Sequence, residues 1–569
     1  MRNFYLGVCN LTFTQNFTAV GGSLTWSAIV AVIPILYFFW ALAIKKMKGY
    51  MAGVTTLFVS LILAAIAFKV PVGIAVMSAT QGAVYGLLPI GWIIITSVFL
   101  YNITVKTGNF HIIRHSVLSI TEDRRIQALL VAFSFGAFLE GAAGFGAPVA
   151  ISAALLVGLG FNPLYAAGLC LIANTAPVAF GAIGVPITAM EGPTGIAAFE
   201  ISKMVGRQLP FLAVFIPFFL VLIMTGFKKA WEVMPAILVS GISFAVTQFL
   251  SSNFLGPELP DVLSALVSLF ALAIFMKFWQ PKTIYRFASE REAIADATAT
   301  KESYSGGTML KSWSPFIILT AFISCWGIPI VKSALTGNYD GTNVILKGIN
   351  VIGQALTFTA EVPLLHNQVL NGTTEEPIAA FYKLELLGAA GTAILLAAIV
   401  SKFIFNVSWH EWGKTFFETL NEIKFPLMTI CSVVAYAYVT NTAGMMTTLA
   451  LVLAKSGVMF PFFAPVLGWL GVFITGSDTS SNVLFAKLQQ VTAESVGMDP
   501  VLALAANASG GVTGKMISPQ SIAVAAAAVG LVGRESELLR FALKYSVMLL
   551  LFICILTFLQ SNVLVWMIP

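Results

Sequence analysis

Three charged residues stand alone within long apolar stretches of this 569-residue chain. Glu140 is the only Asp, Glu, Lys, Arg or His between positions 125 and 191, Asp478 is the only one between 455 and 487, and Lys515 is the only one between 499 and 534. A charge at bilayer depth costs about 2.5–3.5 kcal/mol on insertion scales and marks a functional site by default. We therefore predict that the two acids bind protons and that the lysine holds an anionic group.

Two of these residues also have a structural interpretation. Asp478 is a favoured helix N-cap residue, and a membrane lysine such as Lys515 can extend its side chain to the surface. Ser477 could cap a helix without a buried charge, and Lys515 lies near the middle of its apolar tract. These two observations favour a functional site.

The residues after Glu140 suit the binding of a small anion. The sequence EGAAGFGAP contains Gly141, Gly144 and Gly146, whose missing side chains let a ligand approach the backbone. Pro148 is well placed to start a half-helix, whose free N–H groups and positive dipole end bind carboxylates. We predict a carboxylate-binding break in the helix here.

Further polar groups lie in three other breaks. The sequence TGSDTSSN at 475–482 offers hydroxyl and amide groups, and residues 173–187 and 506–520 read as later breaks of the two halves. Amides can donate to a carboxylate and accept from a hydroxyl, which suits a hydroxy acid, although an Asn can also simply bridge broken backbone. The substrate-binding candidates from these breaks are Asn174, Thr175, Thr479, Ser480, Ser481, Asn482, Asn507 and Ser509.

The composition is that of a polytopic membrane protein. The chain is 58% hydrophobic and only 10% charged, and it repeatedly runs 18 or more residues without a charge. Its net charge of +6 is explained by Lys and Arg in cytoplasmic loops, so no nucleic-acid partner is implied. The five cysteines form no close pair, and His111 and His115 have no acidic or Cys partner at ligand spacing. We expect no cofactor and no metal, and we expect the first helix to be retained.

The chain matches itself at a shift of about 335 residues, which indicates two copies of one unit. The first copy opens beside KKMKG and the second beside NGTTEEP, and this opposite charge predicts inverted copies. We predict an all-α fold with an external N-terminus, 12 crossings with 14 as the alternative, broken helices, and re-entrant hairpins at 126–160 and 460–497. The predicted divisions are an N-terminal segment with the first helix (1–47), the first repeat (48–227), connecting helices with a cytoplasmic loop at 279–312 and an external insert (228–382), and the second repeat (383–569).

Four sequence stretches closely resemble the bacterial lactate permease family. They are FSFGAFLEGAAGFGAPVAIS, LCLIANTAPVAFGAIGVPI, GSDTSSNVLF and ASGGVTGKMISPQSIAVA. The resemblance runs from about Leu24 to the C-terminus. The family includes permeases for L-lactate and for glycolate. The resemblance implies a multi-pass protein of the bacterial cytoplasmic membrane, not an enzyme, that takes up a 2-hydroxy monocarboxylate together with a proton. The polar insert around 335–380 departs from the motifs and leaves the choice of substrate open.

These observations combine into one hypothesis for the site. Lys515 and the half-helix amides hold the carboxylate, Asn174, Asn507 and the hydroxyls at 479–481 recognise the 2-hydroxyl, and Glu140 carries the proton. Asp478 is the rival proton site or the partner of Lys515. A sodium-coupled carboxylate carrier and a passive channel remain alternatives, because hydroxyls, amides and carbonyls at helix breaks also suit Na⁺.

Overall fold

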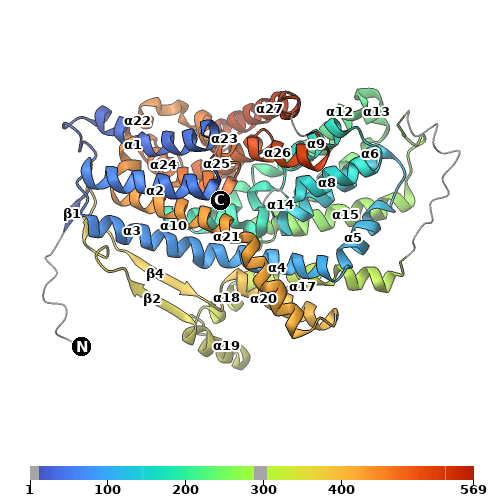
Figure 1. Ribbon diagram of the computed structural model, residues 1–569, viewed down its shortest axis with the longest axis horizontal. Coiled ribbons are helices and arrows are strands. Elements are labelled where there is room, and N and C mark those ends of the chain that lie inside the picture. The colour runs from blue at the N-terminus through green and yellow to red at the C-terminus, as the bar shows by residue number, and fades with distance from the viewer. Residues whose placement is uncertain (1–11, 46, 143, 145–146, 288–303, 532–533) are drawn as a thin grey trace.

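Helices make up most of the structure, a computed structural model that describes residues 12–45, 47–142, 144, 147–287, 304–531 and 534–569 (Figure 1). Within these residues, ten helical stretches are long and apolar enough to cross a membrane, or twelve if each of two bent helix pairs forms one span. The strands form two small two-stranded sheets. The predicted all-α polytopic membrane fold is confirmed.

Most of the helices follow one another with short connections. Those of the first 226 residues are α1 (Leu24–Phe39), α2 (Gly49–Ile66), α3 (Val72–Tyr85), α4 (Trp92–Lys106), α5 (Asn109–Leu118), α6 (Arg124–Ala128), α7 (Gly136–Ala142), α8 (Ala147–Gly158), α9 (Pro163–Ala173), α10 (Gly181–Thr194), α11 (Ala198–Val205) and α12 (Leu209–Thr225). The middle helices are α13 (Phe227–Glu232), α14 (Met234–Phe254), α15 (Pro260–Phe278), α17 (Gly306–Gly327), α18 (Pro329–Leu335) and α19 (Val344–Ala355). The last are α20 (Ala390–Ile404), α21 (Trp409–Thr442), α22 (Met445–Leu453), α23 (Phe460–Thr475), α24 (Asp478–Val496), α25 (Pro500–Lys515), α26 (Pro519–Ala528) and α27 (Glu535–Asn562).

Several helices are interrupted inside apolar tracts, as the Gly and Pro residues predict. The long stretch after Pro71 kinks at Leu88, which has extended backbone angles. The chain turns between α23 and α24 at Gly476, whose φ of 70° favours glycine. Short irregular helices also join the longer ones: η1 (Trp40–Ile44), η2 (Gly86–Gly91), η3 (Leu129–Phe135), η4 (Val178–Phe180), η5 (Ala454–Met459) and η6 (Val565–Met567).

The predicted break at 506–520 is wrong for most of its length, because α25 continues through to Lys515. The glycines serve helix packing instead. A side chain at Gly510 would collide with the carbonyl of Pro465, and one at Gly514 would collide with the carbonyl of Trp469. This Gly-x-x-x-Gly spacing lets α25 lie directly on α23. The actual break spans 516–518, after Lys515.

The polar insert before α20 folds separately from the spans. The strands β2 (Thr357–Glu361) and β4 (Phe381–Glu385) pair antiparallel, and β3 (Val369–Leu370) pairs parallel with β1 (Phe13–Thr14) near the chain start. Figure 1 shows β2 and β4 beside α3, with α19 next to them. The alternative count of 14 crossings needs a span near residues 343–362, but this stretch forms a short helix followed by a strand.

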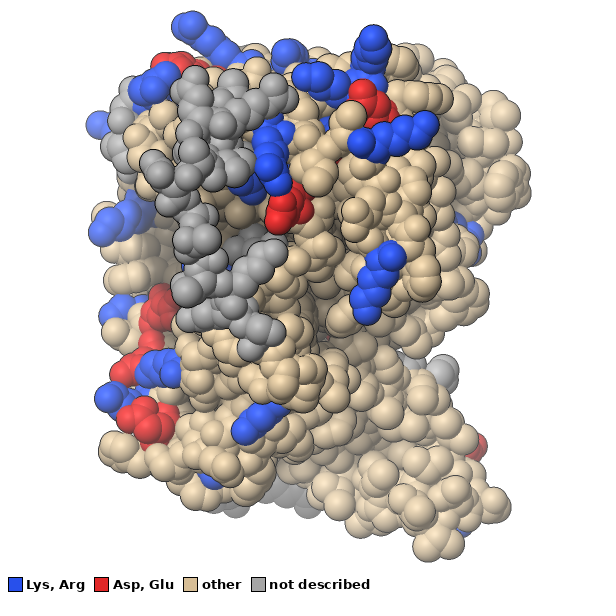
Figure 2. All heavy atoms as spheres, turned by 90° about the vertical axis from the view of Figure 1, so that its right-hand side faces the viewer, with Lys and Arg blue, Asp and Glu red and all other residues tan. Residues whose placement is uncertain are grey.

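The two loops with the strongest basic charge meet at one end of the molecule. The backbone N–H of Arg124 donates to the carbonyl of Tyr285 at 3.0 Å, which joins the loop before α6 to the chain after α15. Figure 2 views this end and shows Lys and Arg side chains gathered across its upper part. The two loops therefore lie together, as loops on one side of a membrane must. The exposed basic residues of this region include Lys106, Arg114, Lys228, Lys282 and Lys311.

Candidate functional site

A pocket with about 570 Å³ of space between atoms, part of it open to solvent, lies where four chain breaks meet. Its walls come from the break after α7, the turn before α10, the first residues of α24, and the end of α25 with the start of α26. The predicted site residues Glu140, Gly144, Asp478, Thr479 and Lys515 all line it. The fold thus brings the three isolated charges into one cavity, although Glu140 lies more than 330 residues before the other two in the sequence.

An ion pair crosses this pocket. Lys515 Nζ lies 3.3 Å from Glu140 Oε1, and the two side chains are only 12% and 3% exposed. Glu140 Oε2 has no hydrogen-bond partner among the described residues. Gly181 makes room for the carboxylate, because a Cβ there would lie 2.9 Å from Glu140 Oε1. The glutamate therefore has one charged partner and a second oxygen free for a proton or a ligand.

The second acid stands at the start of α24. Ser477 caps this helix by accepting from the backbone N–H of Ser480 at 3.2 Å, so the cap does not need Asp478. Asp478 Oδ2 accepts from Asn482 Nδ2 at 3.2 Å, and its Oδ1 is without a partner in the described chain. A side chain at Gly511 would collide with this carboxyl group. Ser477, Asp478 and Thr479 at the start of α24 line the pocket, and the first N–H groups of a helix can bind an anion.

Three amides behind the pocket form a chain that ends at Asp478. Gln489 Nε2 donates to Asn507 Oδ1 at 3.1 Å, and Asn507 Nδ2 donates to Asn482 Oδ1 at 2.9 Å. Asn482 in turn donates to Asp478 and, at 3.1 Å, to the carbonyl of Pro186. Asn482 and Asn507 are fully buried and do not line the pocket. Their amides therefore orient Asp478 and do not contact a molecule in the pocket.

The remaining predicted residues are buried around the pocket without lining it. Ser481 Oγ donates to the carbonyl of Gly468 at 3.2 Å, and Gly141 packs against the first turn of α15. The others in this group are Asn174, Thr175, Ser480 and Ser509, and the hydroxyls of Thr175 and Ser509 have no partner among the described residues. Gly146 lies outside the described residues.

Sequence reasoning missed three polar residues of the pocket wall. Gln520 and Ser521 follow the break after Lys515, and Ser477 precedes Asp478. Their position next to isolated charges was the available signal. For Gln520 and Ser521 it was obscured because the break was assigned to the whole of 506–520, whereas only its end opens the helix, and Ser477 was interpreted only as a helix cap.

One wall of the pocket is strained. Ala182, Ile183 and Gly184 have φ of 45°, 55° and 73°, so three successive residues adopt the left-handed conformation at the start of α10. This conformation costs roughly 1–2 kcal/mol for each residue other than glycine. Ala182 lines the pocket. Strained backbone of this kind clusters at binding and switch sites.

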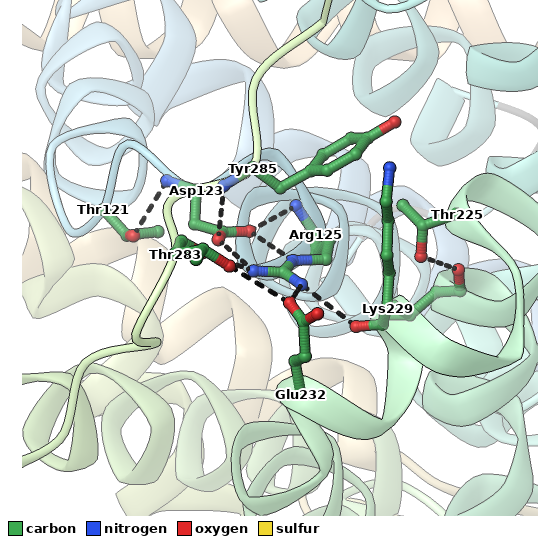
Figure 3. Close-up of polar contacts among 9 residues, drawn as sticks. Thr121, Asp123, Arg125, Thr225, Lys229, Glu232, Thr283 and Tyr285 are labelled. Atoms are coloured by element: carbon green, nitrogen blue, oxygen red, sulfur yellow. Dashed lines mark hydrogen bonds and ion pairs between the residues drawn. The ribbon is translucent and has the colours of Figure 1, made fainter.

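A separate polar cluster lies at the basic end (Figure 3). The guanidinium of Arg125 donates to both carboxyl oxygens of Asp123 at 3.1 and 2.7 Å, and to Glu232 Oε2 at 2.9 Å. It also donates to the carbonyls of Lys229 at 3.0 Å and Thr283 at 2.8 Å. Hydrogen bonds from Arg125, and then from Thr283, lower the pKa of Glu232. The cluster ties α6 and α13 to the chain after α15.

Comparisons with known proteins agree with the resemblance of the sequence motifs. A family model described as L-lactate permease matches residues 27–564. The L-lactate permease of Bacillus subtilis is 68% identical over 98% of this chain and 100% of its own length. The glycolate permease GlcA of Escherichia coli is 52% identical over 97% and 99%, and the L-lactate permease of Halalkalibacterium halodurans is 40% identical over 94% and 97%. With this match and these apolar helices, the chain is a multi-pass protein of the bacterial cytoplasmic membrane and belongs to the L-lactate permease family.

Proposed function

We propose that this protein is a proton-coupled symporter that takes up L-lactate and related small 2-hydroxy monocarboxylates such as glycolate. The relatives named for L-lactate and for glycolate support this substrate class. The pocket supports it independently, because Lys515 supplies the one ammonium group among its described wall residues and the start of α24 also lines it, which suits a molecule with one carboxylate.

The ion pair between Lys515 and Glu140 is the observation that carries the proposal. A substrate carboxylate that takes Lys515 leaves Glu140 beside another anion. Two like charges about 4 Å apart repel by about 4 kcal/mol at an effective dielectric constant of 20. Protonation of Glu140 removes this repulsion and releases the lysine. Binding of the anion and binding of the proton therefore favour one another.

The polar wall of the pocket recognises the rest of the substrate in this proposal. The hydroxyls of Thr479 and Ser521 and the amide of Gln520 line the cavity and can hydrogen-bond a 2-hydroxyl group. Asn482 and Asn507 act one layer behind by holding Asp478. Asp478 then completes the cavity at the start of α24.

Proton coupling also removes the electrical cost of uptake. Moving one negative charge inward against an inside-negative potential costs about 2.3 kcal/mol per 100 mV. A monocarboxylate that travels with one proton moves no net charge. The pocket meets this requirement for a proton carrier, because Lys515 is paired there with a buried carboxyl group, that of Glu140, which can take up a proton.

The test is lactate uptake into proteoliposomes under separately imposed pH, sodium and voltage gradients. We expect a pH gradient, acid outside, to drive accumulation without sodium. Glu140→Gln should abolish this uptake, because the amide cannot release a proton, while exchange of lactate between two lactate-filled sides continues. Accumulation that needs a sodium gradient, or normal acid-driven uptake by the Gln variant, would refute the proposal.

A further inference from the structure

A third acid is buried beside the pocket, and sequence reasoning did not identify it. Asp261 lies in the first turn of α15 and is 0% exposed. Neither of its carboxyl oxygens has a hydrogen-bond partner among the described residues. A buried carboxylate without partners is strongly disfavoured, whereas the protonated form is tolerated.

The position of Asp261 connects it to the ion pair. A Cβ placed on Gly141 would lie 2.8 Å from the Cβ of Asp261, so the missing side chain lets α15 touch the residue that follows Glu140. Glu140 and Lys515 are the charged residues that act on Asp261 electrostatically. Asp261 does not line the pocket itself. It contacts the residue that follows Glu140 in the chain.

Within the described residues, the helices packed most closely on α15 supply no cation that could compensate Asp261. Of these, α14 and η3 contain no ionisable side chain, and α7 contributes only Glu140. The helix α10 carries Glu191, which is exposed. The cluster therefore holds three carboxyl groups, on Glu140, Asp261 and Asp478, against the single ammonium of Lys515. It is neutral only if two of the three carboxyls carry protons.

The three acids differ in the partners that can compensate their charge. Glu140 has the lysine, and Asp478 accepts one hydrogen bond from Asn482. Asp261 has neither. The first turn of a helix can stabilise a carboxylate, but no N–H group of the described chain donates to this one.

We propose that Asp261 stores the coupling proton while Glu140 is paired with Lys515. When the substrate carboxylate takes Lys515, the proton passes from the Asp261 carboxyl to the Glu140 carboxylate, and the aspartate anion then takes a proton from water. One proton enters the site for each anion. This inference rests on the proposed symport and assigns its proton route.

The experiment compares wild type, Asp261→Asn and Ser264→Ala in proteoliposomes. Ser264 is a matched control, since its hydroxyl is also fully buried on α15 and also unpartnered among the described residues. We expect Asp261→Asn to lose lactate uptake driven by a pH gradient and to keep lactate exchange between filled sides, because Glu140 keeps its proton during exchange. Lactate binding to this variant should still depend on pH, whereas binding to Glu140→Gln should not. Ser264→Ala should behave as wild type in every assay.

Infrared spectroscopy of the purified proteins provides a readout that a merely structural role would not change. The carboxylic acid C=O stretching band of the ligand-free wild type should lose intensity in Asp261→Asn and keep it in Ser264→Ala. An unchanged band, normal acid-driven uptake by Asp261→Asn, or loss of both uptake and exchange would overturn the inference. Absence of acid-driven uptake in the wild type would instead refute the proposed function, and the band would still report the proton on Asp261.

Discussion

Replacement of Lys515 by methionine removes the only positive charge among the described residues of the pocket wall and keeps an unbranched side chain of similar length. In the wild type, Lys515 Nζ lies 3.3 Å from Glu140 Oε1. Two unit charges at this separation attract by about 5 kcal/mol at an effective dielectric constant of 20. Loss of one partner of a buried ion pair costs about 3–5 kcal/mol, because the other charge stays buried without compensation. With an unfolding entropy of about 1.2 kcal/mol per K for 569 residues, the melting temperature should fall by about 2.5–4 °C.

The assay is thermal unfolding of detergent-purified protein, followed by tryptophan fluorescence at one fixed scan rate. The double variant Glu140→Gln with Lys515→Met has no unpaired charge from this pair, so we expect it to regain most of the lost stability. Lys487→Met is the control, because Lys487 is also partly buried but pairs with the neutral Gln490 at 3.0 Å.

Lactate affinity gives a second measure of the same substitution. Hydrogen bonds to charged groups contribute about 1.5–3 kcal/mol, so calorimetric titration should show about 10-fold to 150-fold weaker binding for Lys515→Met. The reasoning fails if Lys515→Met unfolds at the wild-type temperature, if the double variant loses the sum of the two single losses, or if lactate binding is unchanged.

Two further variants test other features of the structure. Ala182→Gly relieves about 1–2 kcal/mol of backbone strain and loses a similar amount through chain entropy and one buried methyl group, so its thermal stability should stay within about 1 kcal/mol of wild type. Ala503→Gly in α25 relieves no backbone strain, so it should lower the free energy of unfolding by about 2 kcal/mol. Equal losses of stability in the two variants would contradict the strain at Ala182. Because Arg125 lowers the pKa of Glu232, the stability from this charge is complete above the ordinary glutamate pKa of about 4.3 and is lost as pH falls from there through the lowered value. The difference in melting temperature between wild type and Glu232→Gln should therefore close on acidification, and a constant difference would argue against the contact.

Much of the site was visible in the sequence because charge is costly in an apolar tract. Glu140, Asp478 and Lys515 stood out for this reason, and all three line one pocket. Apolar length likewise predicted the membrane spans. Both signals are local: they depend on how a short segment interacts with lipid, not on its neighbours in the folded chain.

Features that depend on contacts between helices were not predictable in the same way. Asp261 begins a span three residues after Glu258, so it looked like an ordinary residue at a helix end. Only the contact at Gly141 reveals its place beside Glu140. In the same way, Gly510 and Gly514 looked like a helix break, because the sequence does not show that α23 packs against them.

The left-handed residue at the pocket wall has a consequence for the range of cargo. Ala182 lies 333 residues before Lys515, close to the shift of about 335 residues that relates the two predicted copies, so in this prediction one copy supplies a cation and the other supplies only a methyl group. A diacid would bring a second negative group into a cavity whose other charged side chains are Glu140 and Asp478. For the proposed uptake we therefore expect monocarboxylates to be carried and dicarboxylates such as malate to be rejected, because the described pocket wall offers one cation rather than two.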